Sequence, residues 1–338
     1  MLTPNDVRHR KFRTYRSLLY GEVYDAEDVD DFSRLGGRHH QGFRQGSTQS
    51  KKGVAMTVEQ MADDDYFAFD AVDQTALKKY LVSPLAYSQY LTGEHSSSPQ
   101  FEFGKAAHSL ILGSGPEVLV KPNLRTKEGK ARYAETLKLH EGEDIVWLSP
   151  DDVEKVEAMR DMVGDFFTKL DGQPEVAMIA ADPDTGLLIK GKADWLPSTP
   201  DPDGVLRIRD YKTTVKSPDE FERSCWQYGY HIQAAFYMRL YRLTMPEYKG
   251  PLGFEFVVQE KNPPFDWMRY EIQEDSPIIT ELAEPKINHA LQGIRWFRDN
   301  TEDPLEAMRA YGLPKYPKDV VFPDWKLLEE EEEIESWR

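Results

Sequence analysis

Two β-strand patterns that follow one another closely constrain the fold of this chain more than any other feature. Residues 186–196 (GLLIKGKADWL) and 205–213 (VLRIRDYKT) are separated by the turn-rich sequence PSTPDPDG. This combination predicts a β-hairpin. Further strand and helix candidates surround it, the strands at 253–259 and 267–272 and the helices at 149–170, 218–242 and 277–298. An order of helix, strands, helix, strands and helix predicts one α/β core.

Shorter helices are expected before the hairpin. Residues 73–91 (DQTALKKYLVSPLAYSQYL) predict two helices separated at the Ser-Pro step, because proline ends one helix or occupies the first turn of the next. Residues 103–112 (FGKAAHSLIL) are small and apolar enough for a buried helix. We therefore expect the core to carry appended N-terminal helices.

The charge of the chain is distributed unevenly. Its 338 residues include 42 Lys and Arg against 59 Asp and Glu, a formal net charge of −17. Such acidity would argue against a DNA partner, because DNA binding needs local positive charge to displace counterions from phosphates. Residues 141–184 and 319–338, however, carry net charges of −10 and −6, whereas residues 121–138 carry +4. The acidity is therefore regional and does not exclude a polyanionic partner.

Composition predicts three regions. Residues 1–52 are rich in Arg, Gly, His and Gln without sustained periodicity, so we expect a flexible basic arm. With 40% hydrophobic and 12% aromatic residues, the chain can bury a sizeable core, which we assign to a single domain at 53–318. Residues 319–338 contain a glutamate run and are expected to form a solvated acidic tail.

Composition also excludes several classes of protein. No apolar run approaches the roughly 20 residues of a membrane span, and the first residues lack the apolar stretch of a secretory signal. We therefore expect a cytoplasmic protein with no membrane partner. The single cysteine, Cys225, cannot supply a four-cysteine zinc site or a cysteine-ligated iron–sulfur cluster.

Charged residues gather at one end of the predicted hairpin. Strand alternation places Asp210 and Lys212 on the same face of the second strand, and Lys192 and Asp194 on one face of the first. Pairing of the two strands can bring Asp194 close to Asp210. Two carboxylates beside a lysine suit Mg²⁺, which prefers oxygen ligands and leaves positions open for phosphate oxygens. Lys212 would then orient the attacking water and stabilise negative charge.

Four short motifs occur in an order that points to a known family. They are GKAAH at 104–108, GKAD at 191–194, DYK at 210–212 and QAAFY at 233–237. Together they resemble the PD-(D/E)XK nuclease superfamily, in particular the branch of lambda exonuclease, RecB and RecE (exonuclease VIII). SPLAYSQYL and RTKEGKARY resemble further segments of RecE-type phage exonucleases. The resemblance covers about residues 73–300.

The resemblance implies a fold and an activity. The fold is a restriction-endonuclease-like α/β core with a central mixed β-sheet flanked by helices. The activity is Mg²⁺-dependent hydrolysis of phosphodiester bonds at duplex DNA ends, with Mn²⁺ as a substitute, in the 5′-to-3′ direction. The 3′ single-stranded tails so produced would serve recombination with a single-strand annealing protein. The family further implies a homo-oligomer and, for a phage protein, the cytoplasm of a bacterial host.

The resemblance also assigns roles to individual residues. The metal would be held by one histidine, two carboxylates and one backbone carbonyl, those of His108, Asp194, Asp210 and Tyr211. The catalytic residues would be Asp194, Asp210 and Lys212. DNA would be contacted by a mostly basic set, Arg125, Lys127, Lys130, Lys192, Gln233 and Tyr237. Glu175, which precedes the hairpin, is a candidate for a further acidic group.

Several alternatives stay open at this point. The Asp210–Lys212 pair alone could be a surface ion pair on an edge strand, and His108 could be a hydrogen-bonded core histidine. The basic segment could be a solvated loop, and Gln233 and Tyr237 could brace the site or simply pack. The protein could also be an endonuclease with the same site. A non-catalytic scaffold that binds DNA or a partner would be expected to lack one of the catalytic residues, yet all three are present.

Overall fold

The structure is a computed structural model of the chain. It describes residues 56–92, 98–301, 303, 305–306 and 324–337, so the arm predicted at 1–52 lies outside the described residues. The chain divides into two units, Asp30–Glu302 and a second unit made of Met1–Val29 with Asp303–Arg338. In the second unit, α12 (Asp324–Ser336) is a helix that contains the glutamate run. The predicted boundaries at 52 and 318 stay predictions.

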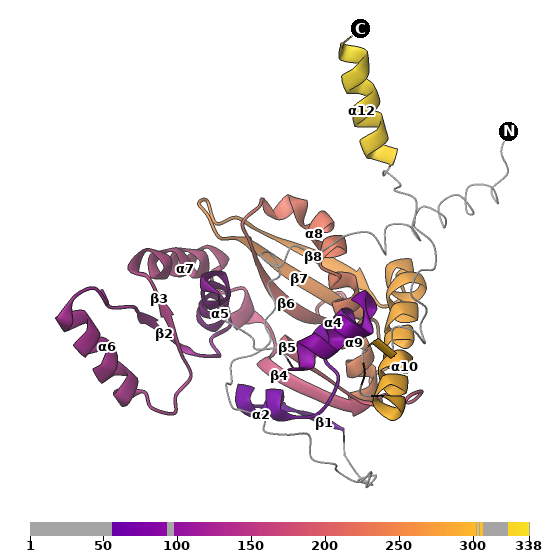
Figure 1. Cartoon of the computed structure of the whole chain (residues 1–338), viewed down its shortest axis with the longest axis horizontal. Coiled ribbons are helices and arrows are strands. Elements are labelled where there is room, and N and C mark those ends of the chain that lie inside the picture. The colour runs from indigo at the N-terminus through magenta and orange to yellow at the C-terminus, as the bar shows by residue number, and fades with distance from the viewer. Residues whose placement is uncertain (1–55, 93–97, 302, 304, 307–323, 338) are drawn as a thin grey trace, which may run out of the picture. The chain divides into compact units, whose positions relative to one another are not determined.

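A six-stranded mixed sheet forms the centre of the larger unit (Figure 1). In spatial order its strands are β1 (Thr57–Gln60), β4 (Gly172–Ala181), β5 (Leu188–Pro197), β6 (Leu206–Thr214), β7 (Leu252–Glu260) and β8 (Trp267–Gln273). β6 and β7 run parallel, and every other neighbouring pair is antiparallel. Because parallel strands need a crossover, the chain leaves the sheet after β6 and returns through helices. The expected α/β fold with a central mixed sheet is confirmed.

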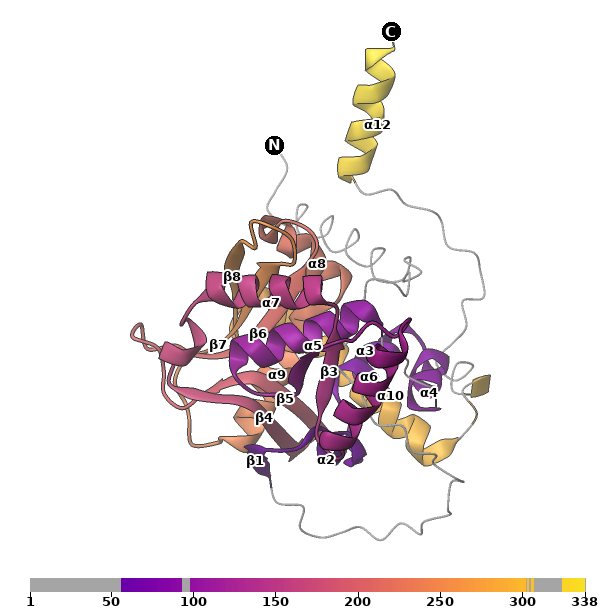
Figure 2. The same ribbon diagram turned by 90° about the vertical axis from the view of Figure 1, so that its left-hand side faces the viewer.

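Helices flank the sheet and enclose two apolar layers. On one side, α9 (Tyr230–Thr244) packs on the sheet, where the ring centroid of Tyr237 lies 5.7 Å from that of Phe254. On the other side lie α5 (Pro99–Leu112) and α7 (Pro150–Val163), which Figure 2 shows running across the strands. Their buried residues share a core with Tyr211 of β6. Neighbouring residues of β6 therefore face different layers.

The N-terminal helices are appended as predicted. α2 (Asp63–Ala68) is followed by α3 (Gln74–Val82) and α4 (Pro84–Thr92), which are separated at Ser83. α3 and α4 pack on α10 (Glu284–Asn300) through aromatic rings. The ring of Tyr87 lies 5.7 Å from that of Tyr80 and 5.8 Å from that of Phe297.

Three predicted helices are shorter than the sequence suggested. The pattern at 149–170 ends as α7 at Val163 and continues as a single 3₁₀ turn, η1 (Phe167–Lys169). The pattern at 218–242 is divided into η2 (Pro218–Glu220), α8 (Phe221–Gln227) and α9. Gly229 separates α8 from α9 because its φ of 65° is a left-handed conformation that favours glycine. The pattern at 277–298 begins as a π-helical turn, η3 (Ile278–Ala283), before α10.

A small lobe that the sequence did not predict lies between α5 and α7 along the chain. It contains the parallel strands β2 (Glu117–Val120) and β3 (Ile145–Leu148), with α6 (Lys127–Leu139) between them. The basic segment therefore forms a helix and not a loop. The reason is local, because Thr126 Oγ1 accepts a hydrogen bond of 2.9 Å from the backbone N–H of Gly129 and caps the helix.

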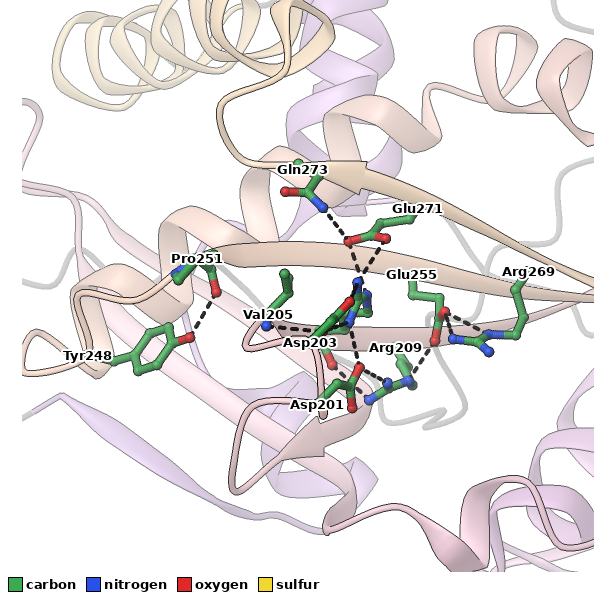
Figure 3. Close-up of polar contacts among 11 residues, drawn as sticks. Asp201, Asp203, Val205, Arg209, Tyr248, Pro251, Glu255, Arg269, Glu271 and Gln273 are labelled. Carbon is green, nitrogen blue, oxygen red and sulfur yellow. Dashed lines mark hydrogen bonds and ion pairs between the residues drawn. The ribbon is translucent and has the colours of Figure 1, made fainter.

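An ion-pair network joins β6, β7 and β8 just before Asp210 and Lys212 along the chain (Figure 3). The Arg209 guanidinium is 2% exposed and lies 2.6 Å from Glu255 Oε2 and 2.5 Å from Asp201 Oδ2. Glu255 also receives Arg269 of β8. Arg207 pairs with Asp201, Asp203 and Glu271. The network ties the 201–203 turn to three strands and sets the position of β6.

Candidate active site

The two predicted carboxylates lie side by side where β5 meets β6. Trp195 of β5 pairs with Arg209 of β6, so Asp194 and Asp210 occupy adjacent positions on the two strands. The backbone N–H of Tyr211 donates a 2.8 Å hydrogen bond to Asp194 Oδ2. This bond fixes the Asp194 carboxylate against β6.

Lys212 and Gln233 hold the two oxygens of Asp210. Lys212 Nζ lies 2.7 Å from Asp210 Oδ2, and Gln233 Nε2 of α9 donates a 2.6 Å hydrogen bond to Asp210 Oδ1. All three side chains are buried. The arrangement fixes the carboxylate of Asp210 and leaves Lys212 beside it. In this structure Gln233 therefore supports Asp210, and its contact with DNA stays a prediction.

His108 approaches the carboxylate of Asp194 from α5. Its Nδ1 atom lies 3.4 Å from Asp194 Oδ2, and its ring meets the ring of Tyr211 edge-on at 5.1 Å. Burial lowers the pKa of His108 to about 3, and the positive charge of Lys212 acts in the same direction. The imidazole is therefore neutral near pH 7, which is the form that can bind a metal.

Glu175 of β4 completes the cluster. The donor atoms of His108, Glu175 and Asp194 all lie within 4.8 Å of one another. Glu175 falls between the pairs Pro174–Trp195 and Val176–Ala193, opposite Asp194, and its φ is 55°. Left-handed backbone is uncommon for a residue other than glycine, and such strained positions concentrate at functional sites.

The electrostatics of this cluster favour a cation. Burial raises the pKa of Asp194 well above its ordinary value, and the neighbouring charges of Asp210 and Glu175 raise it further. Burial also raises the pKa of Glu175, although the ammonium of Lys192 opposes the shift. Buried carboxylates that repel one another are stabilised by a divalent ion. The donor set of one imidazole nitrogen and carboxylate oxygens therefore fits a divalent metal.

Lys192 and Tyr237, which the sequence assigned to DNA contacts, are engaged within the chain. Lys192 Nζ pairs with Glu175 at 2.9 Å and also with Asp63 of α2. Burial alone would lower the pKa of Lys192, but these two carboxylates outweigh burial and raise it. Tyr237 donates a 3.0 Å hydrogen bond from its hydroxyl to the backbone oxygen of Lys192. In this structure the side chains of both residues therefore make contacts within the protein next to the metal-ligand candidates.

The basic residues Arg125, Lys127 and Lys130 lie elsewhere. All three are at or near the start of α6, and none is buried. Figure 1 shows β2 and β3 between α6 and the strands β5 and β6. α6 is held to β3 by the rings of Tyr133 and Trp147, whose centroids are 4.8 Å apart. The structure thus does not bring this basic group to the carboxylates.

Some residues at the site were not predicted from sequence. Asp63 was missed because nothing in the sequence pattern relates α2 to β5, which lies more than a hundred positions later. Tyr230, whose ring centroid lies 5.1 Å from Lys212 Nζ, was also missed. The dense run of aromatic residues at 226–230 (WQYGY) was the one available signal for it.

Comparison with known protein families identifies the superfamily of this chain. A family model described as "PD-(D/E)XK nuclease superfamily" matches residues 72–315. The chain belongs to the PD-(D/E)XK nuclease superfamily. Nucleases of this superfamily hydrolyse nucleic acids with the help of divalent metal ions.

Two solved structures are similar to the chain at low sequence identity. A protein from Eubacterium rectale described as a candidate exonuclease is 15% identical with a TM-score of 0.46, and the match covers 77% of this chain and 96% of that one. The protein SSO0001 is 13% identical with a TM-score of 0.27, over 72% and 97% of the two chains. No curated protein matches the sequence significantly. Within the described residues, no helix is long and apolar enough to cross a membrane.

Proposed function

We propose that this protein is a Mg²⁺-dependent exodeoxyribonuclease that hydrolyses phosphodiester bonds at the ends of duplex DNA. The observation that carries the proposal is the convergence of His108, Glu175 and Asp194 within 4.8 Å, beside the Asp210–Lys212 pair, in a nuclease domain. A neutral imidazole and several carboxylates around one point are suited to a divalent cation.

The metal would be held by His108, Asp194 and Glu175, with Asp210 and the backbone carbonyl of Tyr211 added by family resemblance. When bound, a divalent cation supplies charge neutralisation at the phosphate and lowers the barrier to nucleophilic attack. Mn²⁺ would substitute for Mg²⁺ because both accept oxygen ligands in six-coordinate geometry. No iron–sulfur cluster is expected in a chain with one cysteine.

Lys212 has the position to assist hydrolysis directly. Its ammonium lies 2.7 Å from Asp210 Oδ2, so it can orient the attacking water and stabilise the negative charge that grows on the phosphate oxygens. Gln233 keeps Asp210 in place through a 2.6 Å hydrogen bond. Asp194 is held by the Tyr211 N–H, so the catalytic groups need little rearrangement when substrate binds.

The finer features of the proposal come from the resemblance to the RecE branch. They are the 5′-to-3′ direction, the 3′ single-stranded tails for recombination, a homo-oligomer, a single-strand annealing partner and a phage origin with activity in the bacterial host cytoplasm. For α6, we propose that Arg125, Lys127 and Lys130 contact DNA phosphates away from the point of cleavage. Their exposure and positive charge support this role.

The proposal is tested by following the loss of linear duplex DNA in the presence of Mg²⁺. Wild-type protein should degrade the DNA, EDTA should stop the reaction, and Asp210→Ala should be inactive. Asp184→Ala, which removes an exposed carboxylate in the turn before β5, is the matched control and should retain activity.

Equal activity of the wild type and Asp210→Ala would contradict the assignment of the site. The same assay on closed circular DNA separates two nuclease types. Nicking of the circle would replace the exonuclease by an endonuclease, whereas dependence on a free end supports an exonuclease. A protein that binds DNA without cleaving it under any metal condition would be a scaffold.

A further inference from the structure

Aromatic and basic side chains continue from the catalytic lysine to the molecular surface. The ring of Tyr230, at the start of α9, lies 5.1 Å from Lys212 Nζ and 5.9 Å from the Nζ atom of Lys78 on α3. Phe221 stacks on Tyr230 with the ring planes 14° apart and supports it from α8. The ring of Tyr230 thus lies close to both Lys212 of the site and Lys78 outside it.

The position of Lys78 is set by the turn between α8 and α9. Its Nζ atom donates a 3.1 Å hydrogen bond to the backbone oxygen of Tyr228. Its stem lies across Gly229, where a Cβ atom would come within 3.2 Å of Lys78 Cδ. Glycine at position 229 therefore permits both the left-handed backbone and the close approach of the Lys78 side chain.

Trp226, at the end of α8, presents a large aromatic surface beside this turn. It is 45% exposed, and its ring centroid lies 4.8 Å from that of His231. Burial lowers the pKa of His231 to about 4, and the nearby charges of Lys286 and Lys78 act in the same direction. The imidazole beneath Trp226 is therefore neutral near pH 7.

Basic and acidic side chains both lie around this turn. Lys78 and Lys286 both lie near His231, and Arg223 is exposed on α8. Glu222 is close enough to Cys225 to add to the burial that raises the pKa of that thiol to about 12, and the acidic residues Asp219 and Glu220 are exposed just before α8. The surface thus places an exposed indole beside an imidazole that two lysines approach.

We propose that Trp226 and Lys78 form a binding surface for an unpaired DNA strand that leads into the catalytic site, with the buried ring of Tyr230 linking Lys78 to Lys212. This inference rests on the proposed nuclease function. Unpaired bases stack on aromatic side chains, while ammonium groups follow the phosphates, and alternation of the two is typical of single-strand binding. Bases of a duplex are already stacked and paired, so an exposed indole offers them little.

The experiment measures binding of a fluorescein-labelled twelve-residue oligothymidylate by anisotropy, with Ca²⁺ in place of Mg²⁺ to limit cleavage. The full chain is used. Trp226→Ala should weaken binding about tenfold, because loss of one stacking contact has an effect of this order. Trp226→Phe keeps a ring and should bind nearly as well as the wild type. Trp337→Ala, which removes another exposed tryptophan, is the control and should have no effect.

Lys78→Met gives a second measurement that does not depend on the indole. It should reduce the slope of log affinity against log salt concentration by about 0.7, the value for one phosphate contact on a single strand. Lys169→Met, at an exposed lysine paired with Asp165, should leave the slope unchanged.

Unchanged binding in both Trp226→Ala and Lys78→Met would overturn the inference. So would a wild type that degrades linear duplex DNA but does not bind the oligonucleotide. If the wild type binds the oligonucleotide with these mutational effects but cleaves no DNA with Mg²⁺ or Mn²⁺, the binding surface stands and the nuclease proposal fails.

Discussion

Glu175 is a candidate metal ligand that also has a left-handed backbone conformation. We expect Glu175→Gln to weaken Mn²⁺ binding at least about tenfold, because a charged oxygen donor is replaced by a neutral one. Without metal, its free energy of unfolding should stay within about 1 kcal/mol of the wild type, since Lys192 keeps Asp63 as a partner. Calorimetric titration and denaturant unfolding in EDTA measure the two quantities. Glu154→Gln, at an exposed position of α7, is the control.

Equal Mn²⁺ affinity in Glu175→Gln and Glu154→Gln would remove Glu175 from the ligand set. A large loss of stability without metal would show instead that Glu175 serves mainly to hold Lys192. The strained backbone would then need a structural explanation.

The raised pKa of Asp194 predicts how metal binding depends on pH. Burial, Asp210 and Glu175 favour the protonated carboxyl, so a proton must leave before a cation can bind. Apparent Mn²⁺ affinity should therefore increase with pH, by up to about tenfold per unit while Asp194 is protonated in the metal-free protein. His108 is already neutral and should contribute no proton.

The same shift has an opposite consequence for metal-free stability. A group whose folded pKa is raised adds stability at low pH, and this contribution is lost as the pH rises through the folded value. Metal binding should restore this lost stability.

Titrations of Mn²⁺ in two buffers with different ionisation enthalpies count the protons released on metal binding, and Asp194→Asn should release fewer protons than the wild type. An equal count in the two proteins would show that Asp194 is already ionised.

At the scale of elements, the ion-pair network on β6, β7 and β8 predicts an unequal response to loss of two arginines. Arg209 is 2% exposed between Asp201 and Glu255, so Arg209→Met should lower the free energy of unfolding by about 3–5 kcal/mol. The side chain of Arg269 is 47% exposed and pairs with the same Glu255. Arg269→Met should cost no more than about 1 kcal/mol. Denaturant unfolding measures both, and equal losses would show that burial does not set the strength of these pairs.

The elements that the sequence predicted well were those with uninterrupted patterns. The strands expected at 186–196 and 205–213 are found at Leu188–Pro197 and Leu206–Thr214. β4 was missed because GQPEV, at its start, reads as a turn although the chain there is extended. Helices were predicted too long where a single glycine changes the backbone direction, as at Gly229.

The site was predictable to the extent that its residues lie on neighbouring strands. Asp194 and Asp210 follow from one hairpin register, which strand alternation can supply. Alternation would also place Gly191 and Trp195 on one face, yet Gly191 lies against α9 and Trp195 packs with Phe167 on the opposite side. Simple alternation therefore does not hold along β5. The partners of Lys192 come from β4 and α2, and their approach depends on tertiary packing that no local pattern encodes.

At the scale of the whole molecule, the acidic tail predicts how DNA binding depends on salt. Residues 319–338 carry −6 of the net charge of −17, and five consecutive glutamates at 329–333 supply most of it. Like charge repels DNA over a distance set by the Debye length, about 10 Å at 0.1 M salt and 3 Å at 1 M. Changing these five glutamates to glutamine should speed duplex binding a few fold at about 0.05 M salt, an effect of steering by net charge.

The difference between the variant and the wild type should disappear near 1 M salt, while the rate of cleavage of bound DNA stays the same. Stopped-flow anisotropy with a labelled duplex gives the association rate, and single-turnover cleavage gives the chemical step. The glutamine variant keeps the chain length, so its comparison with the wild type isolates charge. A rate difference that persists at high salt would mean that the glutamate run makes a specific contact, because screened repulsion cannot produce it.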